Sequence, residues 1–316
     1  MKILANDGIS ANGVEELETA GFEVSTVTVA QEQLENYINN EGIVALLVRS
    51  ATKVRKDLID ACPSLKIIGR GGVGMDNIDV EYARNKGLHV INTPAASSES
   101  VAELVFAHLF SGVRFLYDSN RNMPLDGDSR FKALKKAYAK GTELRGKTLG
   151  VIGFGRIGQA TAKIGLGLGM KVIAHDPFME KAAVTLPFFD GQSVTFDINI
   201  QSKEGVLKQA DFITLHVPAQ KEFVIGVAEI EMMKDGAGLV NAARGGVVDE
   251  VAMVAALKSG KLSFAGVDTF ENEPTPAVQL LMTSNVSLTP HIGAATTQAQ
   301  QRIGSELATQ IISILK

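Results

Sequence analysis

Short apolar segments alternate with longer amphipathic segments along nearly the whole chain of 316 residues. Nearly continuous apolar strands separated by helical patterns are typical of parallel sheets that helices cover on both faces. The sequence therefore predicts an α/β protein with doubly wound parallel sheets. The expected strands form two series: Lys2–Asn6, Ala45–Val48, Ile67–Gly69 and His89–Asn92, then Thr148–Gly153, Lys171–Ala174, Phe212–His216, Ala237–Asn241, Phe264–Val267 and Val286–Thr289.

A boundary segment between the two series favours two sheets, and hence two domains, over one. It begins with an amphipathic helix expected from Ser100 to about Tyr117, with Ser100 and Glu103 as a capping box. The polar, basic stretch 119–147 that follows is expected to be an arm between the domains. Further on, the alternation within Thr185–Ser202 suggests an extra strand or a hairpin.

Composition narrows the class of protein and its partners. The formal net charge of −4 is unlike that of nucleic-acid binders, which usually present a strongly basic face. Cys62 is the single cysteine, so no intramolecular disulfide can form, which fits a reducing compartment. The chain shows neither a signal-peptide pattern nor an apolar run of about 18 residues. We therefore expect a cytoplasmic protein without nucleic-acid or membrane partners, and without a bound metal.

A glycine motif marks the start of the second series. Gly153, Gly155 and Gly158 match G-x-G-x-x-G where a strand turns into a helix. In such a motif the first glycine permits the tight turn, the second lets a pyrophosphate approach the backbone, and the third allows close packing of helix and strand. A glycine pattern alone can be a simple turn, but here a second apolar strand follows it. We therefore expect a dinucleotide site.

Asp176 extends this motif. It lies eighteen residues after Gly158, near the spacing expected of a carboxylate that binds the ribose hydroxyls of a dinucleotide. A carboxylate there would repel the extra phosphate of NADP, so NAD is favoured. The alternative is that Asp176 is a solvated turn residue before Pro177.

Three polar residues follow later strands, at the edge where doubly wound sheets bind their ligands. Arg244 lies in the segment Asn241–Glu250, Glu273 precedes Pro274, and His291 follows Pro290. Taken singly, each has a plainer interpretation: a surface arginine paired with a neighbouring carboxylate, a solvated acidic loop, and a structural histidine.

Together these residues make a unit suited to hydride transfer. A hydroxy acid must lose its hydroxyl proton as hydride leaves the carbon, and imidazole is the usual base near neutral pH. A carboxylate such as that of Glu273 would orient the ring of His291 and stabilise its protonated form. The planar guanidinium of Arg244 would fix the substrate carboxylate through two parallel hydrogen bonds.

The ordered motifs resemble the signatures of D-isomer-specific 2-hydroxyacid dehydrogenases. These motifs are Gly153–Gly158, Asn241–Glu250, Asp268–Pro274 and Pro290–Thr296. Segments of the first half are similar to the substrate domain of phosphoglycerate dehydrogenases within this family, so the resemblance covers almost the whole chain. These segments are Val48–Val54, Gly69–Asp79, Asn92–Pro94 and Ser100–Leu104.

The resemblance implies roles for individual residues. Arg244 would bind the substrate, Glu273 rather than Glu271 would support the histidine, and His291 would donate or accept the proton. Asp268 would lie near the nicotinamide. NAD would be bound by Gly153, Gly155, Arg156, Ile157, Gly158, Asp176, His216, Val217, Pro218, Ala242, Asp268, Gly293 and Ala294, and the substrate by Arg49, Ser50, Gly72 and Val73.

The resemblance also implies an architecture. A flavodoxin-like substrate domain would comprise residues 1–97 and 289–316, and a Rossmann NAD-binding domain residues 98–288. Members of the family dimerise through the region of about 100–147, so we expect a homodimer, or a homotetramer of paired dimers. The regulatory ACT domain of some phosphoglycerate dehydrogenases is not expected, because the sequence stops at Lys316.

The substrate is a separate hypothesis. We expect 3-phosphoglycerate, whose phosphate needs cations such as Arg49, Lys53 and Arg70; lysines 132, 135 and 136 are further candidates unless they form only a solvated helix face. The alternatives within the class are a glyoxylate or hydroxypyruvate reductase and a D-lactate dehydrogenase. The alternative from another class is an NAD(H)-responsive binding protein similar to the corepressors of this fold.

Overall fold

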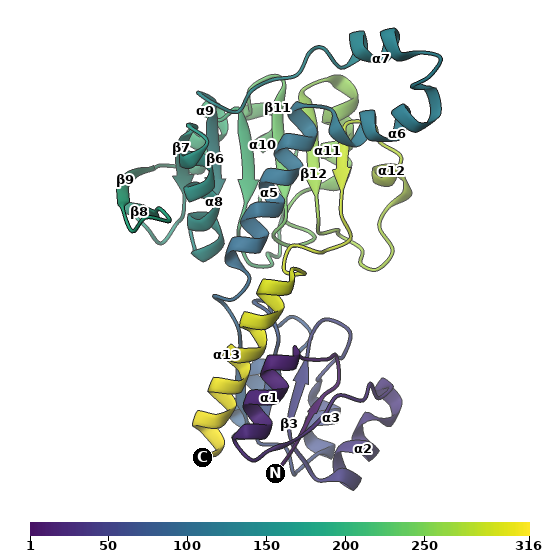
Figure 1. Cartoon of the computed structure of the whole chain (residues 1–316), viewed down its shortest axis with the longest axis vertical. Helices are drawn as coiled ribbons and strands as arrows, with labels where there is room; N and C mark the ends of the chain where they lie inside the picture. Colours follow the sequence, from purple (N-terminus) through teal and green to yellow (C-terminus); the bar gives the residue numbers. More distant parts are fainter. The chain divides into compact units, whose positions relative to one another are not determined.

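The computed structural model describes every residue from Met1 to Lys316. The chain divides into two compact units, one made of Met1–Ser100 with Ala294–Lys316 and the other of Val101–Gly293 (Figure 1). Each unit contains one sheet of mainly parallel strands, which confirms the predicted α/β class. None of the helices combines the length and the apolar composition that a membrane crossing requires.

The first unit is built on a five-stranded parallel sheet with the order β2-β1-β3-β4-β5, which is the flavodoxin-like order. Successive residues of β1 pack on opposite faces: Leu4 joins the core under α2, α3 and α4, and Ile3 joins the core under α1 and α13. The strands are β1 (Lys2–Ala5), β2 (Glu23–Ser25), β3 (Ile43–Val48), β4 (Ile67–Arg70) and β5 (His89–Asn92). The helices are α1 (Ala11–Thr19), α2 (Leu34–Glu41), α3 (Lys56–Ala61), α4 (Val80–Asn85) and α13 (Thr297–Leu315), with a 3₁₀ turn at Gln31–Gln33.

The last helix, α13, returns to this first unit and packs along α1. The two helices touch at Gly13 and Gly304, where a Cβ on Gly13 would lie 2.8 Å from the Cα of Gly304. Thr296 caps the helix, since its hydroxyl accepts a hydrogen bond from Ala299 N at 3.1 Å.

The second unit contains an eight-stranded sheet with the order β13-β12-β11-β10-β6-β7-β9-β8. The chain order reverses between β6 and β10, and such a switch point is where doubly wound sheets bind ligands at the carboxyl ends of their strands. The strands are β6 (Thr148–Ile152), β7 (Lys171–His175), β8 (Ala182–Pro187), β9 (Ser193–Ile200), β10 (Phe212–Leu215), β11 (Ala237–Asn241), β12 (Leu262–Val267) and β13 (Val286–Leu288). The helices are α5 (Ser98–Val113), α6 (Leu116–Asp126), α7 (Phe131–Ala137), α8 (Arg156–Gly167), α9 (Lys203–Gln209), α10 (Val227–Met232), α11 (Glu250–Ser259) and α12 (Val278–Leu281).

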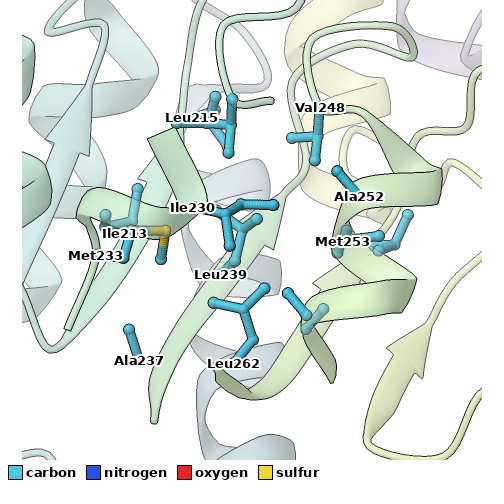
Figure 2. Packing of buried hydrophobic residues seen from close by; sticks show 14 of the residues in the cluster. Ile213, Leu215, Ile230, Met233, Ala237, Leu239, Val248, Ala252, Met253 and Leu262 are labelled. Atoms are coloured by element: carbon cyan, nitrogen blue, oxygen red, sulfur yellow. The ribbon is translucent and has the colours of Figure 1, made fainter. Parts of the chain in front are cut away.

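One face of this sheet is covered by α10 and α11, whose apolar side chains meet those of the central strands (Figure 2). Leu239 of β11 is completely buried, with Ile230 of α10 and Met253 of α11 in the same cluster. This packing fixes the central strands, and therefore the loops that leave their carboxyl ends.

Two local predictions at the boundary segment are wrong. Helix α5 begins at Ser98 and ends at Val113, so Ser100 lies inside its first turn rather than at its cap. The Ser100 hydroxyl pairs instead with the hydroxyl of Thr296 at 2.7 Å. Phe115 adopts a left-handed conformation with φ 54° and separates α5 from α6.

The two less regular segments also take definite forms. The stretch 119–147, expected as an arm, contains most of α6 and all of α7. For the segment Thr185–Ser202 the sequence suggests an extra strand or a hairpin, and the structure shows a hairpin. The segment forms part of the antiparallel pair β8–β9, which adds two strands to the edge of the sheet.

Candidate active site

The glycine motif forms the turn between β6 and α8. Gly153 has φ 88°, and a Cβ there would lie 2.5 Å from the carbonyl oxygen of His216, so the position requires glycine. A Cβ on Gly158 would lie 2.2 Å from the carbonyl oxygen of Gly153, so this glycine lets the helix start close to the strand. By contrast, an added Cβ on Gly155 would meet no atom within 4 Å. The open space beside Gly155, at the N-terminus of α8, suits a pyrophosphate.

Asp176 follows β7 directly and faces this turn. Its carboxylate accepts hydrogen bonds from Phe154 N at 2.8 Å and from Phe178 N at 2.9 Å. The side chain is partly exposed, and each oxygen keeps a further lone pair for a ribose hydroxyl. Its placement at the end of the strand next to the glycine turn fits the adenosine half of a dinucleotide. Arg156 and Ile157 open the first turn of α8, with Arg156 exposed.

His216 follows β10, on the other side of the switch point. Its Nε2 lies 3.2 Å from the hydroxyl of Thr161 and 3.1 Å from that of Thr214, while its buried Nδ1 has no hydrogen-bond partner. Burial lowers the pKa of His216 to about 3, so the ring is neutral at physiological pH. Val217 and Pro218 continue from it toward the surface. A buried ring nitrogen without a hydrogen-bond partner is unusual, and it fits a site that a ligand completes.

The loop after β11 carries Arg244. Asn241 at the end of the strand is 4% exposed; its Nδ2 donates to Arg244 O at 3.0 Å, and its Oδ1 accepts from Ala243 N at 3.1 Å. The Nη1 of Arg244 donates to Ala243 O at 2.7 Å. Ala242 and Ala243 are buried behind the loop.

The carboxylates of Asp249 and Glu250 each accept a hydrogen bond from a backbone N–H. Asp249 caps α11 by accepting from Ala252 N, and Glu250 accepts from Glu271 N.

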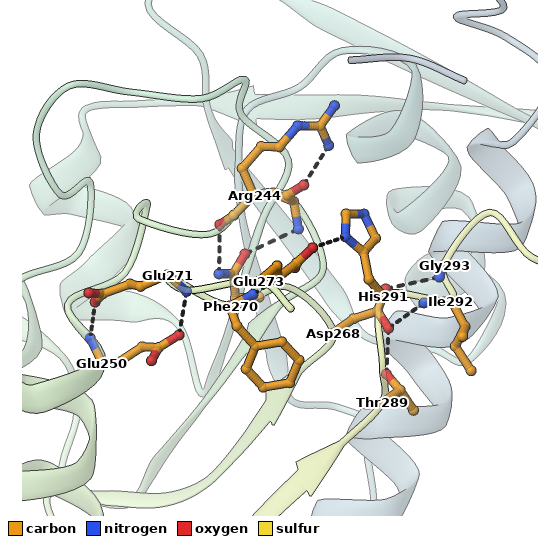
Figure 3. A network of polar contacts seen from close by, with 12 residues as sticks. Arg244, Glu250, Asp268, Phe270, Glu271, Glu273, Thr289, His291, Ile292 and Gly293 are labelled. Carbon is orange, nitrogen blue, oxygen red and sulfur yellow. Dashed lines mark hydrogen bonds and ion pairs between the residues drawn. The ribbon is translucent and has the colours of Figure 1, made fainter. Parts of the chain in front are cut away.

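Glu273 and His291 form a hydrogen-bonded pair. Nδ1 of His291 lies 2.8 Å from Oε2 of Glu273, and Oε1 of Glu273 accepts from Phe270 N at 3.0 Å. The carboxylate is thus fixed by the backbone on one side and orients the imidazole on the other. Both side chains are partly exposed, at 44% for His291 and 37% for Glu273, so the Nε2 edge of the ring is accessible. In Figure 3, Arg244 and His291 extend from neighbouring loops on the same side of Glu273.

Asp268, at the end of β12, is buried and holds the loop of His291. Its Oδ1 accepts from the Thr289 hydroxyl at 2.6 Å and from Ile292 N at 2.8 Å, and its Oδ2 accepts from Gly293 N at 2.9 Å (Figure 3). A Cβ on Gly293 would lie 3.1 Å from Oδ2, so glycine permits this close approach. The cofactor contact of Asp268 stays a prediction, whereas the hydrogen bonds show that its carboxylate organises the turn that carries His291.

Two glutamates connect the loop of Arg244 with the loop of Glu273. Glu250 N donates to the carboxylate of Glu271, and Glu271 N donates to the carboxylate of Glu250, both at 2.8 Å. Burial, together with the nearby charge of Glu271, raises the pKa of Glu250. The loops also touch through the backbone, because a Cβ on Gly245 would lie 1.8 Å from Phe270 O. No local sequence pattern indicates that these two glutamates pair.

The expected substrate residues belong to the first unit. Arg49 and Ser50 follow β3, while Gly72 and Val73 follow β4. Ala294, expected as a cofactor residue, also belongs to this unit.

The loop of Arg49 is held by two residues that the sequence analysis did not single out. The carboxylate of Asp7 accepts from Arg49 N at 2.6 Å and from the Thr52 hydroxyl at 2.6 Å. The amide of Asn77 donates to Arg49 O at 2.7 Å and to Thr52 O at 2.6 Å. Asp7 lies just after the carboxyl end of β1, which is the signal that could have found it, whereas Asn77 lies in the longer loop after β4.

Comparison with known proteins places this site in a family. Residues 106–293 match the model of the NAD binding domain of D-isomer specific 2-hydroxyacid dehydrogenases. The chain is 42% identical over 319 residues to a D-3-phosphoglycerate dehydrogenase of Methanocaldococcus jannaschii. This similarity covers 100% of this chain and 58% of that protein. It is also 42% identical over 299 residues to a hydroxypyruvate reductase of Thermotoga maritima, over 93% of this chain and 91% of that protein.

The fold is similar to that of a D-lactate dehydrogenase of Aquifex aeolicus solved with NAD and lactic acid. That structure gives a TM-score of 0.76 and 30% sequence identity, over 100% of this chain and 95% of that chain. The chain thus spans somewhat more than half the length of its relative from M. jannaschii and most of the length of the other two proteins. By the match of its NAD-binding domain and by its identity to full-length relatives, the chain belongs to the D-isomer specific 2-hydroxyacid dehydrogenase family.

Proposed function

We propose that this protein interconverts a D-2-hydroxy acid and its 2-oxo acid with NAD(H), and that its substrate pair is 3-phosphoglycerate and 3-phosphohydroxypyruvate, the first step of phosphorylated serine biosynthesis. The observation that carries the proposed reaction is the pair His291–Glu273, with Nδ1 and Oε2 2.8 Å apart and the Nε2 edge accessible. Both residues lie in loops at the carboxyl edge of the sheet, and the glycine turn lies at the same edge.

In the reducing direction, the protonated His291 gives its Nε2 proton to the carbonyl oxygen of the 2-oxo acid, and C2 receives a hydride. The nicotinamide of NADH, when bound, would supply that hydride. Glu273 holds the ring through Nδ1–H and stabilises its positive charge before the transfer. Arg244 binds the substrate carboxylate and orients the carbonyl carbon. In the oxidising direction neutral His291 takes the hydroxyl proton instead.

The phosphorylated substrate is favoured by the relatives and by the cations of the first unit. The relative from M. jannaschii is a D-3-phosphoglycerate dehydrogenase, and its similarity covers the whole of this chain. Arg49 follows β3 on a loop that Asp7 and Asn77 hold. We assign Arg49 to the substrate phosphate, because a guanidinium binds phosphate through two parallel hydrogen bonds.

Hydroxypyruvate is the second candidate. The relative from T. maritima is a hydroxypyruvate reductase of nearly the same length, with the same 42% identity. This substrate has the same 2-oxo acid group without the phosphate, so the same Arg244, Glu273 and His291 would serve it.

The test is a screen that follows NADH absorbance with phosphohydroxypyruvate, hydroxypyruvate, glyoxylate, pyruvate and 2-oxoglutarate. We expect the highest kcat/KM with phosphohydroxypyruvate. A preference for hydroxypyruvate supports the second candidate. Absence of NADH turnover with the whole panel would contradict the proposed reaction and favour an NAD(H)-responsive binding protein.

Arg49→Glu tests the phosphate assignment. We expect the KM for phosphohydroxypyruvate to rise by about 100-fold, while the KM for hydroxypyruvate rises far less. Lys66→Glu is the matched control, because Lys66 is exposed and directly precedes the amino end of β4. Arg49, by contrast, follows the carboxyl end of the parallel strand β3. Equal effects of Arg49→Glu on both substrates would argue against a phosphate contact.

We also propose that the chain forms homodimers through the region of α5, α6 and α7. No residue of α6 is buried within the chain, although the helix carries apolar side chains. Leu116, Met123 and Leu125 are exposed there, as is Phe131 at the start of α7. An exposed apolar surface of this kind marks protein–protein contact.

A further inference from the structure

A buried histidine on α5 is hydrogen-bonded to the strand that leads to His291. His108 is 1% exposed, with Nδ1 2.9 Å from the hydroxyl of Ser287 and Nε2 3.0 Å from the hydroxyl of Thr289. From Thr289 the chain of bonds continues to Asp268, whose Oδ1 is 2.6 Å from the threonine hydroxyl. The proposed reaction does not use His108 directly.

In each of these hydrogen bonds, only one of the two groups can be the donor. Thr289 has a single hydroxyl hydrogen, which it donates to the carboxylate of Asp268. Its oxygen must therefore accept from Nε2–H of His108. Burial lowers the pKa of His108, so the ring is neutral and carries one N–H. Nδ1 is then an acceptor, and Ser287 donates to it.

This series of hydrogen bonds reaches the backbone next to His291. Asp268 accepts from the amides of Ile292 and Gly293, the two residues that follow His291. His291 itself has φ 54°, a left-handed conformation that residues other than glycine adopt only where their surroundings hold them. The amides of Ile292 and Gly293 hold this turn by donating to Asp268, together with the bond from His291 N to Thr289 O at 3.1 Å.

We propose that His108 is a positioning residue for His291. Its Nε2–H holds the Thr289 hydroxyl toward Asp268, and the carboxylate in turn fixes the turn 291–293 so that the imidazole of His291 meets Glu273. This inference rests on the proposed function, since it assigns the geometry of the residue that transfers the proton. His108 does not touch substrate or cofactor in this scheme.

The kinetic test compares His108→Phe and Thr289→Val with the conservative variant Thr289→Ser. We expect the first two to lower kcat by at least about tenfold while the Kd for NADH stays within about twofold, because a small displacement of a reacting group costs rate rather than cofactor binding. Thr289→Ser keeps the hydroxyl and should restore most of the rate. Thermal melts of each variant confirm that it is folded.

A double variant distinguishes one connected series of hydrogen bonds from two independent defects. His108→Phe with Thr289→Val should be no slower than Thr289→Val alone, because both changes break the same chain of bonds. Multiplicative losses, or an unchanged kcat in both single variants, would overturn the proposal.

A second readout does not depend on turnover. Nitrogen-15 NMR of the protein without substrate should find His108 in the Nε2–H tautomer, and Thr289→Val should speed hydrogen exchange at the amides of Ile292 and Gly293. An Nδ1–H tautomer or unchanged exchange contradicts the inference. If the wild-type protein reduces no 2-oxo acid, the proposed function fails while this measurement still decides the chain of bonds.

Discussion

At the scale of single residues, the candidate site depends on the separate tasks of the two carboxylate oxygens of Glu273. Oε1 is fixed by Phe270 N at 3.0 Å, and Oε2 meets Nδ1 of His291 at 2.8 Å. Because the backbone holds the carboxylate, the ring orientation is set before a substrate arrives. Preorganisation of this kind lowers the barrier without a rearrangement during the reaction.

Replacing the carboxylate by an amide tests this arrangement. Glu273→Gln keeps the size of the side chain but removes the charge that stabilises the protonated imidazole. We expect kcat to fall by about 10² to 10⁴, with the Kd for NADH unchanged. The exposed Glu231 gives the matched control Glu231→Gln. A Glu273→Gln enzyme with wild-type kcat would show that Glu273 has no part in proton transfer.

The burial of His216 predicts how the free energy of unfolding depends on pH. Its folded-state pKa of about 3 lies below the ordinary value of 6.5. Below pH 6.5 the unfolded chain therefore binds more protons at this residue, and the free energy of unfolding falls as the pH falls. At pH 5 the loss from this one residue amounts to about 2 kcal/mol relative to pH 7.5.

Denaturant unfolding at pH 7.5 and pH 5 measures this loss. His216→Gln cannot titrate, so the difference between the two pH values should shrink by that amount. The exposed His89 gives the control His89→Gln, which should behave as the wild type does. An equal pH dependence in His216→Gln and wild type would contradict the burial of a neutral ring.

The sequence indicated some candidate site residues and not others, for a physical reason. Arg244, Glu273 and His291 each follow a parallel strand, and the carboxyl ends of parallel strands meet at one edge, so their proximity could be expected. The contact of His108 with Thr289 joins residues 181 positions apart through side chains alone. No local pattern encodes such a contact, so only the structure reveals it.

At the scale of elements, the pair Glu250–Glu271 ties the start of α11 to the loop that follows β12. Each side chain accepts the backbone N–H of the other residue. The bonds therefore hold the loop of Arg244 against the loop of Glu273, and the two loops should act as one rigid support.

Removal of one acceptor tests this support. Glu271→Ala leaves Glu250 N without its partner, and we expect a loss of about 1–2 kcal/mol in the free energy of unfolding and about a tenfold fall in kcat/KM. Glu271→Gln keeps a carbonyl oxygen for the bond and should remain close to wild type. Equal behaviour of the two variants would mean that the hydrogen bond does not support the site.

The predicted elements differ from the observed ones where tertiary contacts decide the result. Most expected strands end within one or two residues of the observed ones, because continuous apolar runs must be buried in a parallel sheet. β2, with three half-exposed or exposed residues, has too little apolar pattern to be found. Ser100 reads as a helix cap, but it pairs with Thr296, a contact between distant segments that a local pattern does not contain.

At the scale of the whole molecule, α6 is an element without a core of its own. An amphipathic helix is normally stabilised by burying its apolar face, yet the apolar side chains of α6 are exposed within one chain. A second copy of the chain would provide the missing cover.

Sedimentation tests this proposal. We expect the wild type to sediment as a dimer, and the double variant Leu125→Asp with Phe131→Asp as a monomer, because charges at these exposed apolar positions oppose their burial. Phe189→Asp, at the exposed tip of the hairpin β8–β9, is the control and should leave the dimer intact. A monomeric wild type, or a dimer that only the hairpin variant disrupts, would refute this interface.

The most direct test of the account is the rate of NADH oxidation by the wild type and by His291→Asn with the 2-oxo acid that the wild type reduces best. If the accessible Nε2 of His291 supplies the proton, the variant binds NADH as the wild type does but turns over at least about 10³-fold more slowly. A variant that retains more than about a tenth of the wild-type rate would contradict the assignment of proton transfer to this residue.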